Sequence, residues 1–546
     1  MNWRFLALAA ALLGTLGLLG CEPANKPFAE DDDDSASDAD SDSDTDADAD
    51  TDSDVDEDCT VGELFCMDGD VYECIGPDNE ATLVEECESP LVCVNGMCVD
   101  DDACGYAIAN ASNVGCEYWA VDMDNTTPGQ PYAIVVSNLE SSTAVHVDVE
   151  QRSGSGYVLL DSADVPSKTT HVFMLGDTTT SGSYFLSAKA FRVTSDLPVV
   201  AYQFNPYAGL TPDESDICTN DGSLLIATSG LDMYYYTLAY EPTNGQSSVN
   251  IIATEDGTTV HVTPSAAVSA GTSVPAIPAG GTETFAMDAA DVVQLNSGQD
   301  LSGTYIEADK KVAVFGGNTC AFVPASVMYC DHMEHQMFPL TTWGQEFVAA
   351  RTVIRSTYTE PENDYWRVIA SEDGTYIETD PSVPGLDGQT MSAGQVIEVG
   401  VNYSYVVSAS APIMIGQFLT GHNATDVPWE GAGGDPAFAL LPPYEQFMTN
   451  YVFLAPEKYI SDYVVITHPT GLTVDLDDTP VTSNPDCITE AFNADWEIAR
   501  CLIPDFTHTI DSAEGVGISV WGYGGRVSYG YTGGLNLETI NPIIPE

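Results

Sequence analysis

The strongest constraint on the fold of this chain is an internal repeat of about 100 residues. A pattern of a strand, an Asp-Gly turn and a second strand occurs at residues 249–262 (VNIIATEDGTTVHV) and again at residues 366–379 (WRVIASEDGTYIET). Asp and Gly suit a tight turn because its centre requires positive φ, so each copy predicts a β-hairpin. Asp256 and Asp373 are accordingly interpreted as turn residues and not as catalytic carboxylates.

A short apolar run closes each copy of the repeat. The four runs begin at residues 198, 311, 412 and 517, and they are typical of strands that are buried on both faces. Units of this length exceed small solenoid repeats and the usual propeller blade of about 40–50 residues. The pattern therefore predicts an all-β fold of about four tandem, packed β-sandwich-like repeats, with very large propeller blades as the alternative.

A connector that begins with Asp joins successive copies. In the second connector, residues 331–335, His332 and His335 lie beside carboxylates, a combination that suggests a metal site. The spacing is not the His-Glu-x-x-His pattern of metalloproteases. Sequence alignment of the repeats places Gly222 and Pro436 opposite His332, which favours an ordinary connector over a metal site.

The N-terminal segment has the form of a secretory signal, with one positive charge followed by an apolar run at residues 5–19. This run is shorter than the roughly 20 apolar residues that span a bilayer. Residues 18–21 (LLGC) resemble the bacterial lipoprotein signal, in which the cysteine thiol is acylated. The resemblance implies that residues 1–20 are a signal peptide and that Cys21 carries lipid. An ordinary cleaved signal peptide is the alternative.

Residues 21–58 combine this cysteine with a strongly acidic segment. Residues 30–58 hold 17 acidic side chains and no basic one, and Asp alternates with small residues over residues 38–56. Such a segment buries too little apolar surface to fold, and charge repulsion extends it. We interpret it as a disordered tether. Loose binding of Ca²⁺ by these carboxylates is the one cofactor that the sequence suggests. The segment lacks the Gly turn and the closing Glu of an EF-hand-like loop.

Fourteen cysteines in an exported chain predict disulfide bonds. The early cysteines include no Cys-x-x-Cys pair of the kind that zinc ribbons use, which argues against a zinc site. Residues 59–104 are therefore expected to form a small disulfide-stapled domain, whose pairing the sequence leaves open, and Cys218 is expected to stay unpaired. The twelve candidates for disulfides are Cys59, Cys66, Cys74, Cys87, Cys93, Cys98, Cys104, Cys116, Cys320, Cys330, Cys487 and Cys501.

Charge and motifs narrow the classes of function. The chain has 14 Lys and Arg against 84 Asp and Glu, whereas nucleic-acid binding requires a basic surface. It has neither the Gly-x-Ser-x-Gly elbow of serine hydrolases nor a phosphate-binding Gly-Lys-Ser/Thr loop. We expect no nucleic-acid partner and no catalysis. Aromatic residues are the main indication of a binding surface, with burial in strands as the alternative; the candidates are Tyr234, Tyr236, Trp429, Tyr529 and Tyr531.

Several motifs in a fixed order resemble a known family. They include residues 116–122 (CEYWAVD), 201–206 (AYQFNP), 306–317 (IEADKKVAVFGG) and 528–531 (SYGY). Together they are similar to the N-terminal domain of the IgG Fc-binding protein family, in the form carried by bacterial lipoproteins, over roughly residues 105–540. The resemblance implies a secreted binding or adhesive module without enzymatic activity. It does not carry over an affinity for IgG.

These observations predict a lipid-anchored, surface-exposed protein of a bacterial cell envelope, most simply of the outer membrane. Its β-repeat domain, residues 105–546, is expected to bind an extracellular protein or glycan in adhesion. A structural envelope or coat component is one alternative, and a secreted carbohydrate-active hydrolase is another. The sequence leaves the ligand and the oligomeric state open.

Overall fold

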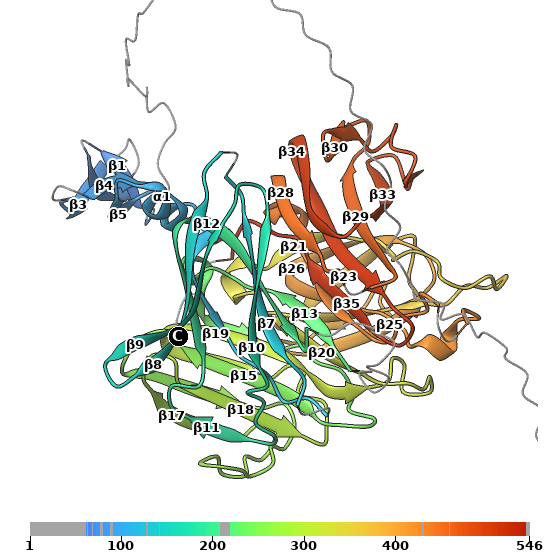
Figure 1. Cartoon of the computed structure of the whole chain (residues 1–546), viewed down its shortest axis with the longest axis horizontal. Coiled ribbons are helices and arrows are strands. Elements are labelled where there is room, and N and C mark those ends of the chain that lie inside the picture. Colours follow the sequence, from blue (N-terminus) through green and yellow to red (C-terminus); the bar gives the residue numbers. More distant parts are fainter. Residues whose placement is uncertain are drawn as a thin grey trace, which may run out of the picture. The chain divides into compact units, whose positions relative to one another are not determined.

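The computed structural model describes residues 62, 64–67, 69–76, 80–87, 91–126, 129–140, 142–207, 219–428, 431–457 and 459–541. These residues belong to one unit of the chain, Asp58–Glu546, and strands make up nearly all of its regular structure (Figure 1). Among the described residues, no helix combines the length and the apolar character that crossing a bilayer requires. The expected signal peptide, the lipidated Cys21, the acidic tether, Cys59, Cys218 and Trp429 lie outside the described residues.

The first described segment is small and cross-linked. It contains β1 (Leu64–Met67), β2 (Asp70–Gly76), β3 (Glu80–Glu85), β4 (Leu91–Val94), β5 (Met97–Asp100) and α1 (Ala103–Ala109). Asp102 begins α1 by accepting a hydrogen bond from the Gly105 N–H at 2.8 Å. The disulfide bonds of this segment are Cys66–Cys93, Cys87–Cys98 and Cys104–Cys116, and Cys74 is also disulfide-bonded. Disulfides are the expected source of stability here because so short a segment builds little core.

Four β units of one plan follow. The first contains β6 (Gly115–Ala120), β7 (Tyr132–Asn138), β8 (Val145–Ser153), β9 (Gly156–Val165), β10 (Thr170–Gly176), β12 (Phe191–Asn205) and β13 (Asp221–Leu224). The second contains η1 (Thr228–Gly230), β14 (Asp232–Tyr236), β15 (Ser247–Ala253), β16 (Thr258–Thr263), β17 (Glu283–Met287), β18 (Val292–Ser297), β19 (Tyr305–Ala321) and β20 (Asp331–Gln336).

The third and fourth units repeat this order. The third contains η2 (Leu340–Thr342), β21 (Gly344–Ala349), β22 (Asp364–Ala370), β23 (Thr375–Asp380), β24 (Thr390–Met391), β25 (Val396–Val401), β26 (Tyr405–Phe418), η3 (His422–Ala424) and β27 (Phe438–Leu441). The fourth contains η4 (Tyr444–Gln446), β28 (Met448–Ala455), β29 (Ser461–Pro469), β30 (Val474–Leu476), β31 (Thr479–Pro480), β32 (Cys487–Ala491), β33 (Trp496–Ile503), β34 (Phe506–Tyr523) and β35 (Ser528–Thr532).

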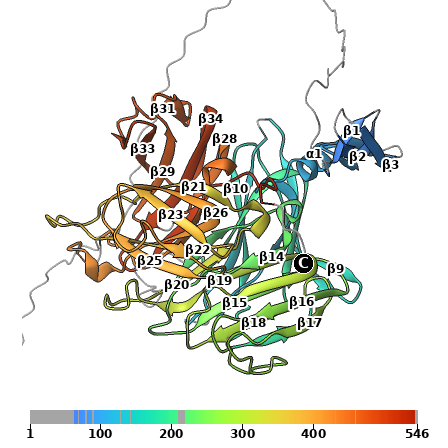
Figure 2. The same cartoon turned by 180° about the vertical axis from the view of Figure 1, so that it is seen from behind.

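One long strand organises each unit: β12, β19, β26 or β34 (Figures 1 and 2). In the second unit, the first half of β19 pairs with β14 and β16, and its second half pairs with β15 and β20. The other three units have the same arrangement. The first half of β19 alternates between buried and exposed positions, whereas its second half is buried throughout. The long strand thus joins two layers, which confirms the expectation of repeated β-sandwich-like units.

The predicted Asp-Gly hairpins are wrong in their pairing. Gly257 and Gly374 do have positive φ, at 68° and 87°, and each lies in a turn between two strands. However, β15 and β16 do not pair with each other, because β15 bonds to the second half of β19 and β16 bonds to the first half. β22 and β23 divide along β26 in the same way. The turn therefore carries the chain from one layer to the other.

The four closing strands, β13, β20, β27 and β35, lie against one another, and Figure 1 shows β13, β20 and β35 in the interior of the repeat region. Each follows its long strand and pairs with the second half of it. β13 contacts both β20 and β35, and β27 contacts the same two strands. The four strands thus form a closed ring of contacts, and the segments read from sequence as simple connectors are central core elements.

The strand register also corrects the alignment of the second connector. The equivalent long-strand residues Phe204 and Gly317 pair with Gly222 and Glu334. Glu334, and not His332, is therefore the counterpart of Gly222. The alignment failed because the segments that lead into the closing strands differ in length, so their initial Asp residues do not coincide in space.

Two backbone pairings link one unit to another. The short strand β11 (Tyr184–Leu186) leaves the first unit and pairs with β18 of the second. At the other end of the chain, Ser112 forms a β-bridge with Asn536. Asn113 reinforces this closure, because its backbone N–H donates to Leu535 O at 3.2 Å and its side-chain Oδ1 accepts from Leu535 N at 3.0 Å. The beginning and the end of the repeat region are thus joined directly.

Candidate functional site

Loops from all four units gather at the end of the ring where the closing strands begin. Three strand ends lie side by side in each unit: the start of β7, β15, β22 or β29, the end of the long strand, and the start of the closing strand. In the second unit, for example, Ser247 of β15 pairs with Asn318 of β19, and Ala321 of β19 pairs with Asp331 of β20. The loops that join these strand ends therefore share one side, which we call the loop face. Its described residues are 121–126, 129–131, 206–207, 219–220, 237–246, 322–330, 350–363, 419–428, 431–437, 456–457, 459–460 and 524–527.

Hydrogen bonds interlock these loops from one unit to the next. Asn220 of the first unit bonds to both of its neighbours: its backbone N–H donates to Asp331 Oδ1 of the second unit, and its Nδ2 donates to Tyr459 Oη of the fourth. Gly421 N of the third unit donates to Val323 O of the second at 3.1 Å. Gly434 N of the third unit donates to Gly524 O of the fourth at 2.9 Å. The disulfide bond Cys320–Cys330 closes one loop covalently. The loop face is therefore a fixed surface on a rigid frame, the usual location of binding residues.

Large apolar side chains are exposed on this face. They are Met328, Tyr329, Ile354, Tyr358 and Ile460. Met328 is 57% exposed and Tyr358 is 51% exposed. Tyr358 rests on the loop 419–437 through a hydrogen bond from its hydroxyl to Thr425 O at 3.4 Å. Exposed Tyr and Met are enriched at protein interfaces, so these residues form the candidate functional site.

Two exposed carboxylates lie in the loops that form the Tyr358 part of this apolar group. Glu360 and Asp426 are exposed in the same loops, and Asp426 accepts a hydrogen bond from Thr357 N at 2.8 Å. Hydrogen bonding to the Thr357 backbone and side chain lowers the pKa of Asp426, which keeps this carboxylate charged at neutral pH. The site therefore combines an apolar contact area with a negative rim.

Among the closing strands beneath the loop face, one carboxylate contacts all four units. Asp221 is fully buried. Its Oδ2 accepts from the N–H groups of Glu334 at 3.2 Å and Phe438 at 3.1 Å, and its Oδ1 accepts from Gly222 at 2.9 Å and Gly530 at 3.1 Å. These four donors come from four different units. Burial raises the pKa of Asp221, while the backbone N–H groups oppose that change by favouring the charged form.

Two further carboxyl groups lie just before or at the start of closing strands. Asp331 and Asp435 are both buried. Burial raises the pKa of Asp435 to about 7, and burial together with the nearby Asp435 raises the pKa of Asp331 well above its usual range. The Oδ2 atom of each has no hydrogen-bond partner among the described residues. Because solvent does not reach them, these groups are placed to hold strands together, and a substrate has no access to them.

The histidines considered for a metal site are core residues on β20. His332 Nε2 lies 3.3 Å from Glu334 Oε2, and His335 Nδ1 bonds to Gln336 O at 2.7 Å. Burial lowers the pKa of His335 to about 4. Residues three apart on a strand point to opposite faces, so the two rings do not converge on one ion. Nowhere in the described part of the chain do three or more His, Cys, Asp or Glu side chains gather as a metal site.

The aromatic candidates divide into two groups. Tyr529 and Tyr531 are fully buried, and their hydroxyls donate to Asp462 Oδ1 at 2.8 Å and to Leu454 O. The expectation that these two residues form a binding surface is therefore wrong, because both side chains pack between the fourth unit and Phe204 and Tyr202 of the first. Tyr234 and Tyr236 on β14 are half-buried, and the Tyr236 ring lies 5.1 Å from that of Tyr305.

The sequence patterns did not predict the exposed apolar residues of the loop face. Their loops carry no periodic pattern, and exposure there depends on which strands pair. One signal was available, because Met328 and Tyr329 lie inside the ten-residue interval between Cys320 and Cys330. A short disulfide loop buries few of its own side chains, so apolar residues within it are candidates for exposure.

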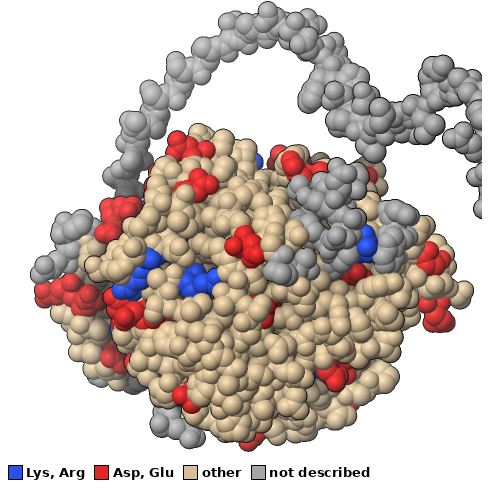
Figure 3. All heavy atoms as spheres, turned by 60° about the horizontal axis from the view of Figure 1, so that its bottom comes forward, with Lys and Arg blue, Asp and Glu red and all other residues tan. Residues whose placement is uncertain are grey.

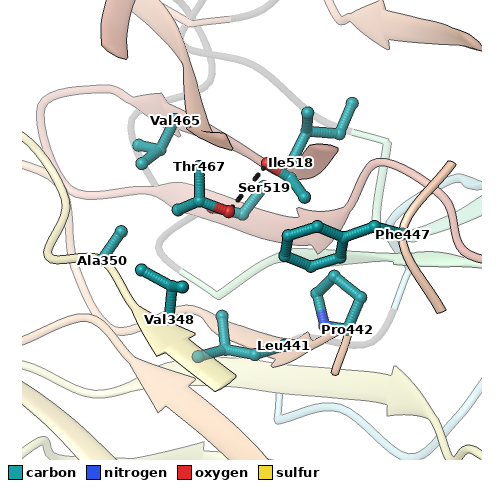
Figure 4. A pocket seen from close by; sticks show the side chains of 10 residues that line it. Val348, Ala350, Leu441, Pro442, Phe447, Val465, Thr467, Ile518 and Ser519 are labelled. Carbon is teal, nitrogen blue, oxygen red and sulfur yellow. Dashed lines mark hydrogen bonds between the residues drawn. The ribbon is translucent and has the colours of Figure 1, made fainter. Parts of the chain in front are cut away.

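A gap between the third and fourth units offers no catalytic arrangement. Figure 4 shows this cavity of about 20 Å³, which is lined by Val348, Ala350, Leu441, Pro442, Phe447, Val465, Thr467, Gly517, Ile518 and Ser519. Thr467 Oγ1 donates to Gly517 O at 3.2 Å across it. The volume suffices for about one water molecule, and no titratable side chain lines it. It is a packing gap between repeats.

Comparison with known proteins agrees with this arrangement of repeats. The family model described as IgGFc binding protein matches residues 221–522, from the first residue of β13 into β34. The human (Homo sapiens) IgGFc-binding protein is 24% identical over 350 residues, which make up 61% of this chain and 6% of that protein. The chain thus spans only a small part of the length of this relative. No solved structure matches. Because the family model covers more than half of its residues, this chain belongs to the IgGFc binding protein family.

Proposed function

We propose that this chain is a non-catalytic binding protein that holds an extracellular protein against its loop face. The observation that carries the proposal is the exposed apolar group of the loop face, Met328, Tyr329, Ile354, Tyr358 and Ile460, which comes from three of the four units. The family supports it, since the family model and the human relative are both described as binding proteins. The human relative is described as binding IgG Fc, and Fc is therefore the first target to test.

The rigidity of the loops supports an interface of useful affinity. Binding is weakened when loops must become ordered on contact. Here Cys320–Cys330 restrains the loop that carries Met328 and Tyr329, and the hydrogen bond to Thr425 restrains Tyr358. The side chains are thus held ready for contact in the free protein. The negative rim of Glu360 and Asp426 favours a target with a basic patch, because complementary charge speeds association and excludes competitors.

We further propose that a lipid on Cys21 anchors the protein in the envelope of a bacterium and that it acts at the cell surface. The support is the sequence at residues 18–21 and the acidic segment that follows. Mass spectrometry of the mature N-terminus tests this proposal. A diacylglycerol adduct on Cys21 supports it, and an unmodified thiol at that position contradicts it.

The binding proposal is tested with the full chain immobilised on a biosensor and exposed to IgG Fc and to a panel of purified extracellular proteins. The test variant is Met328→Ala/Tyr358→Ala. The matched control is Met174→Ala/Tyr376→Ala, which removes the same two types of side chain, 48% and 42% exposed, from β10 and β23. We expect saturable binding to a member of the panel, reduced at least tenfold in the test variant and within twofold in the control.

Two results would contradict the proposal. Binding that is equally strong in the test variant would place the interface elsewhere on the molecule. Equal losses in the test variant and in the control would show general apolar adhesion in place of a defined site. Binding to Fc itself decides only whether the target named for the human relative applies to this chain.

A further inference from the structure

A cavity on another part of the molecule has the properties of a small-ligand site. Its volume is about 430 Å³, within the usual range of about 300–1,000 Å³ for such sites. It lies where α1, β6, β12 and η1 meet Lys311 of β19. Residues 227–229 of its wall follow the far end of β13, whereas the loop face lies where β13 begins. The cavity and the candidate protein interface are therefore separate sites.

The cavity contains an ammonium group without an ion-pair partner. Lys311 Nζ donates to Ser229 O at 2.7 Å and to Thr228 O at 3.4 Å, and no carboxylate of the described residues lies within ion-pairing distance of it. Asp232 and Glu255 act on it only from further away, and burial lowers the pKa of Lys311. A half-buried cation of this kind costs solvation free energy that an anionic ligand restores.

A second cation lines the same cavity. Arg192 Nε donates to Glu117 Oε1 at 2.9 Å, and its guanidinium carbon lies 4.6 Å above the centre of the Tyr157 ring. Glu117, which also lines the cavity, and Glu150, whose Oε2 lies 3.6 Å from Arg192 Nη1, both pair with Arg192. Of the two cations in the lining, Lys311 is thus the one that pairs with no carboxylate of the described residues. A cation in such a position is notable in a chain of net charge −70. Figure 3 shows how little of the drawn face Lys and Arg occupy.

The remaining lining indicates what kind of anion fits. Four residues with hydroxyl groups line the cavity: Thr194, Ser195, Thr228 and Ser229. Ile108 and the Cys104–Cys116 disulfide form an apolar wall beside them. Hydroxyl groups suit the hydroxyls of a sugar ring, and an apolar wall suits its carbon face or an acetamido methyl group. An inorganic anion would accept hydrogen bonds from the hydroxyl groups but would make no use of the apolar wall.

The geometry points to a binding site for an acidic sugar, whose carboxylate pairs with Lys311 and whose ring lies against Ile108 and the disulfide. The same carboxylate chemistry occurs in sialic acids and in uronic acids, and the experiment separates these two sources. The site takes its ligand without chemical change. It is independent of the proposed protein interface, so either can fail while the other stands.

The test is calorimetric titration of the full chain with N-acetylneuraminic acid, with glucuronic acid and with the methyl ester of each. We expect saturable binding of at least one acid and at least tenfold weaker binding of its uncharged ester. Lys311→Met keeps the length of the side chain and removes its charge, and it should weaken binding at least tenfold. Lys310→Met is the matched control, since Lys310 bonds to Asp256 O and does not line the cavity; it should change binding less than twofold.

A second pair of variants guards against misfolding of Lys311→Met. Ile108→Glu adds a negative charge to the exposed wall of the cavity, and Tyr106→Glu adds the same charge to α1 at an exposed position outside it. We expect Ile108→Glu alone to abolish binding of the acid. Absence of saturable binding for both acids, equal binding of acid and ester, or equal losses in the two members of a pair would overturn the proposal.

Discussion

The carboxylate of Asp221 accepts a hydrogen bond from the backbone N–H of Gly530, which lies 309 residues further along the chain. The same carboxylate accepts from the N–H groups of Glu334 and Phe438. One side chain of the first unit thus bonds to the closing strand of every other unit. The ring of closing strands therefore depends on a buried acceptor that all four units share, as well as on apolar packing beside it, such as that between the rings of Tyr202 and Tyr531 at 5.0 Å.

Replacing Asp221 should destabilise all four units together. Asp221→Ala leaves four N–H groups without their acceptor, and each buried unsatisfied group costs about 1–3 kcal/mol. We expect the free energy of unfolding to fall by at least about 3 kcal/mol. Denaturant unfolding followed by fluorescence measures this change, with Glu378→Gln at an exposed position of β23 as the control. A loss below that of an ordinary surface substitution would show that Asp221 is not a shared anchor.

Some parts of this architecture could be predicted from sequence because they depend on local chemistry. The repeated Asp-Gly turns, the apolar runs and the pairing of close cysteines such as Cys320 and Cys330 all rest on neighbours in the chain. Strand pairing rests on distant partners. Nothing near Gly257 shows that β15 and β16 bond to different halves of β19.

The candidate site was harder to predict for the same reason. Tyr531 and Tyr358 are both aromatic residues next to polar ones, but Tyr531 is fully buried and Tyr358 is half-exposed. The difference arises because β35 is enclosed by the other closing strands, whereas residues 350–363 lie on the loop face. The cavity around Lys311 likewise joins residues from α1, β6 and β19, a combination with no counterpart in the order of the sequence.

The buried carboxyl group of Asp435 should make stability depend on pH. Burial raises its pKa from 3.8 to about 7, so between about pH 4 and pH 7 the folded chain keeps a proton that the unfolded chain has released. This contribution to stability is complete below pH 4 and is lost as the pH rises through 7. Asp435→Asn keeps the shape and the acceptor for His422 N but removes the titration.

The difference between the wild type and Asp435→Asn cancels the titrating groups that do not interact with Asp435, and it reports Asp435 together with Asp331, whose pKa the nearby Asp435 raises. We expect the variant to gain stability relative to the wild type as the pH rises from 4 to 8, by on the order of 1 kcal/mol per pH unit within the window. Unfolding in urea at each pH measures it. A difference that stays constant with pH would show that Asp435 ionises in the folded protein at its ordinary pKa.

The disulfide bond Cys320–Cys330 should support both the stability and the binding surface. Closing a loop of this length stabilises a protein by about 2–3 kcal/mol in the chain-entropy description. Cys320→Ala/Cys330→Ala should lower the free energy of unfolding by this amount and increase hydrogen exchange in residues 322–330 and in the adjoining Gly421, whose N–H donates to Val323 O. Unchanged exchange in that loop would mean that hydrogen bonds alone hold it.

The junction of the two ends of the repeat region should open more easily than the junctions within the chain, because no covalent linker crosses it. A β-bridge between Ser112 and Asn536 and the side-chain bond of Asn113 to Leu535 join segments that lie 422 residues apart, in addition to the bond from Gly530 N to Asp221. Asn113→Ala removes the acceptor of Leu535 N in a buried position, which should cost about 1–2 kcal/mol. The loss should show as faster hydrogen exchange in β6 and in residues 533–537 before exchange rises in the third unit. Asn423→Ala, at an exposed loop position, should leave both regions unchanged. Exchange that rises equally in all four units would show that the ring opens as a whole and has no preferred point of opening.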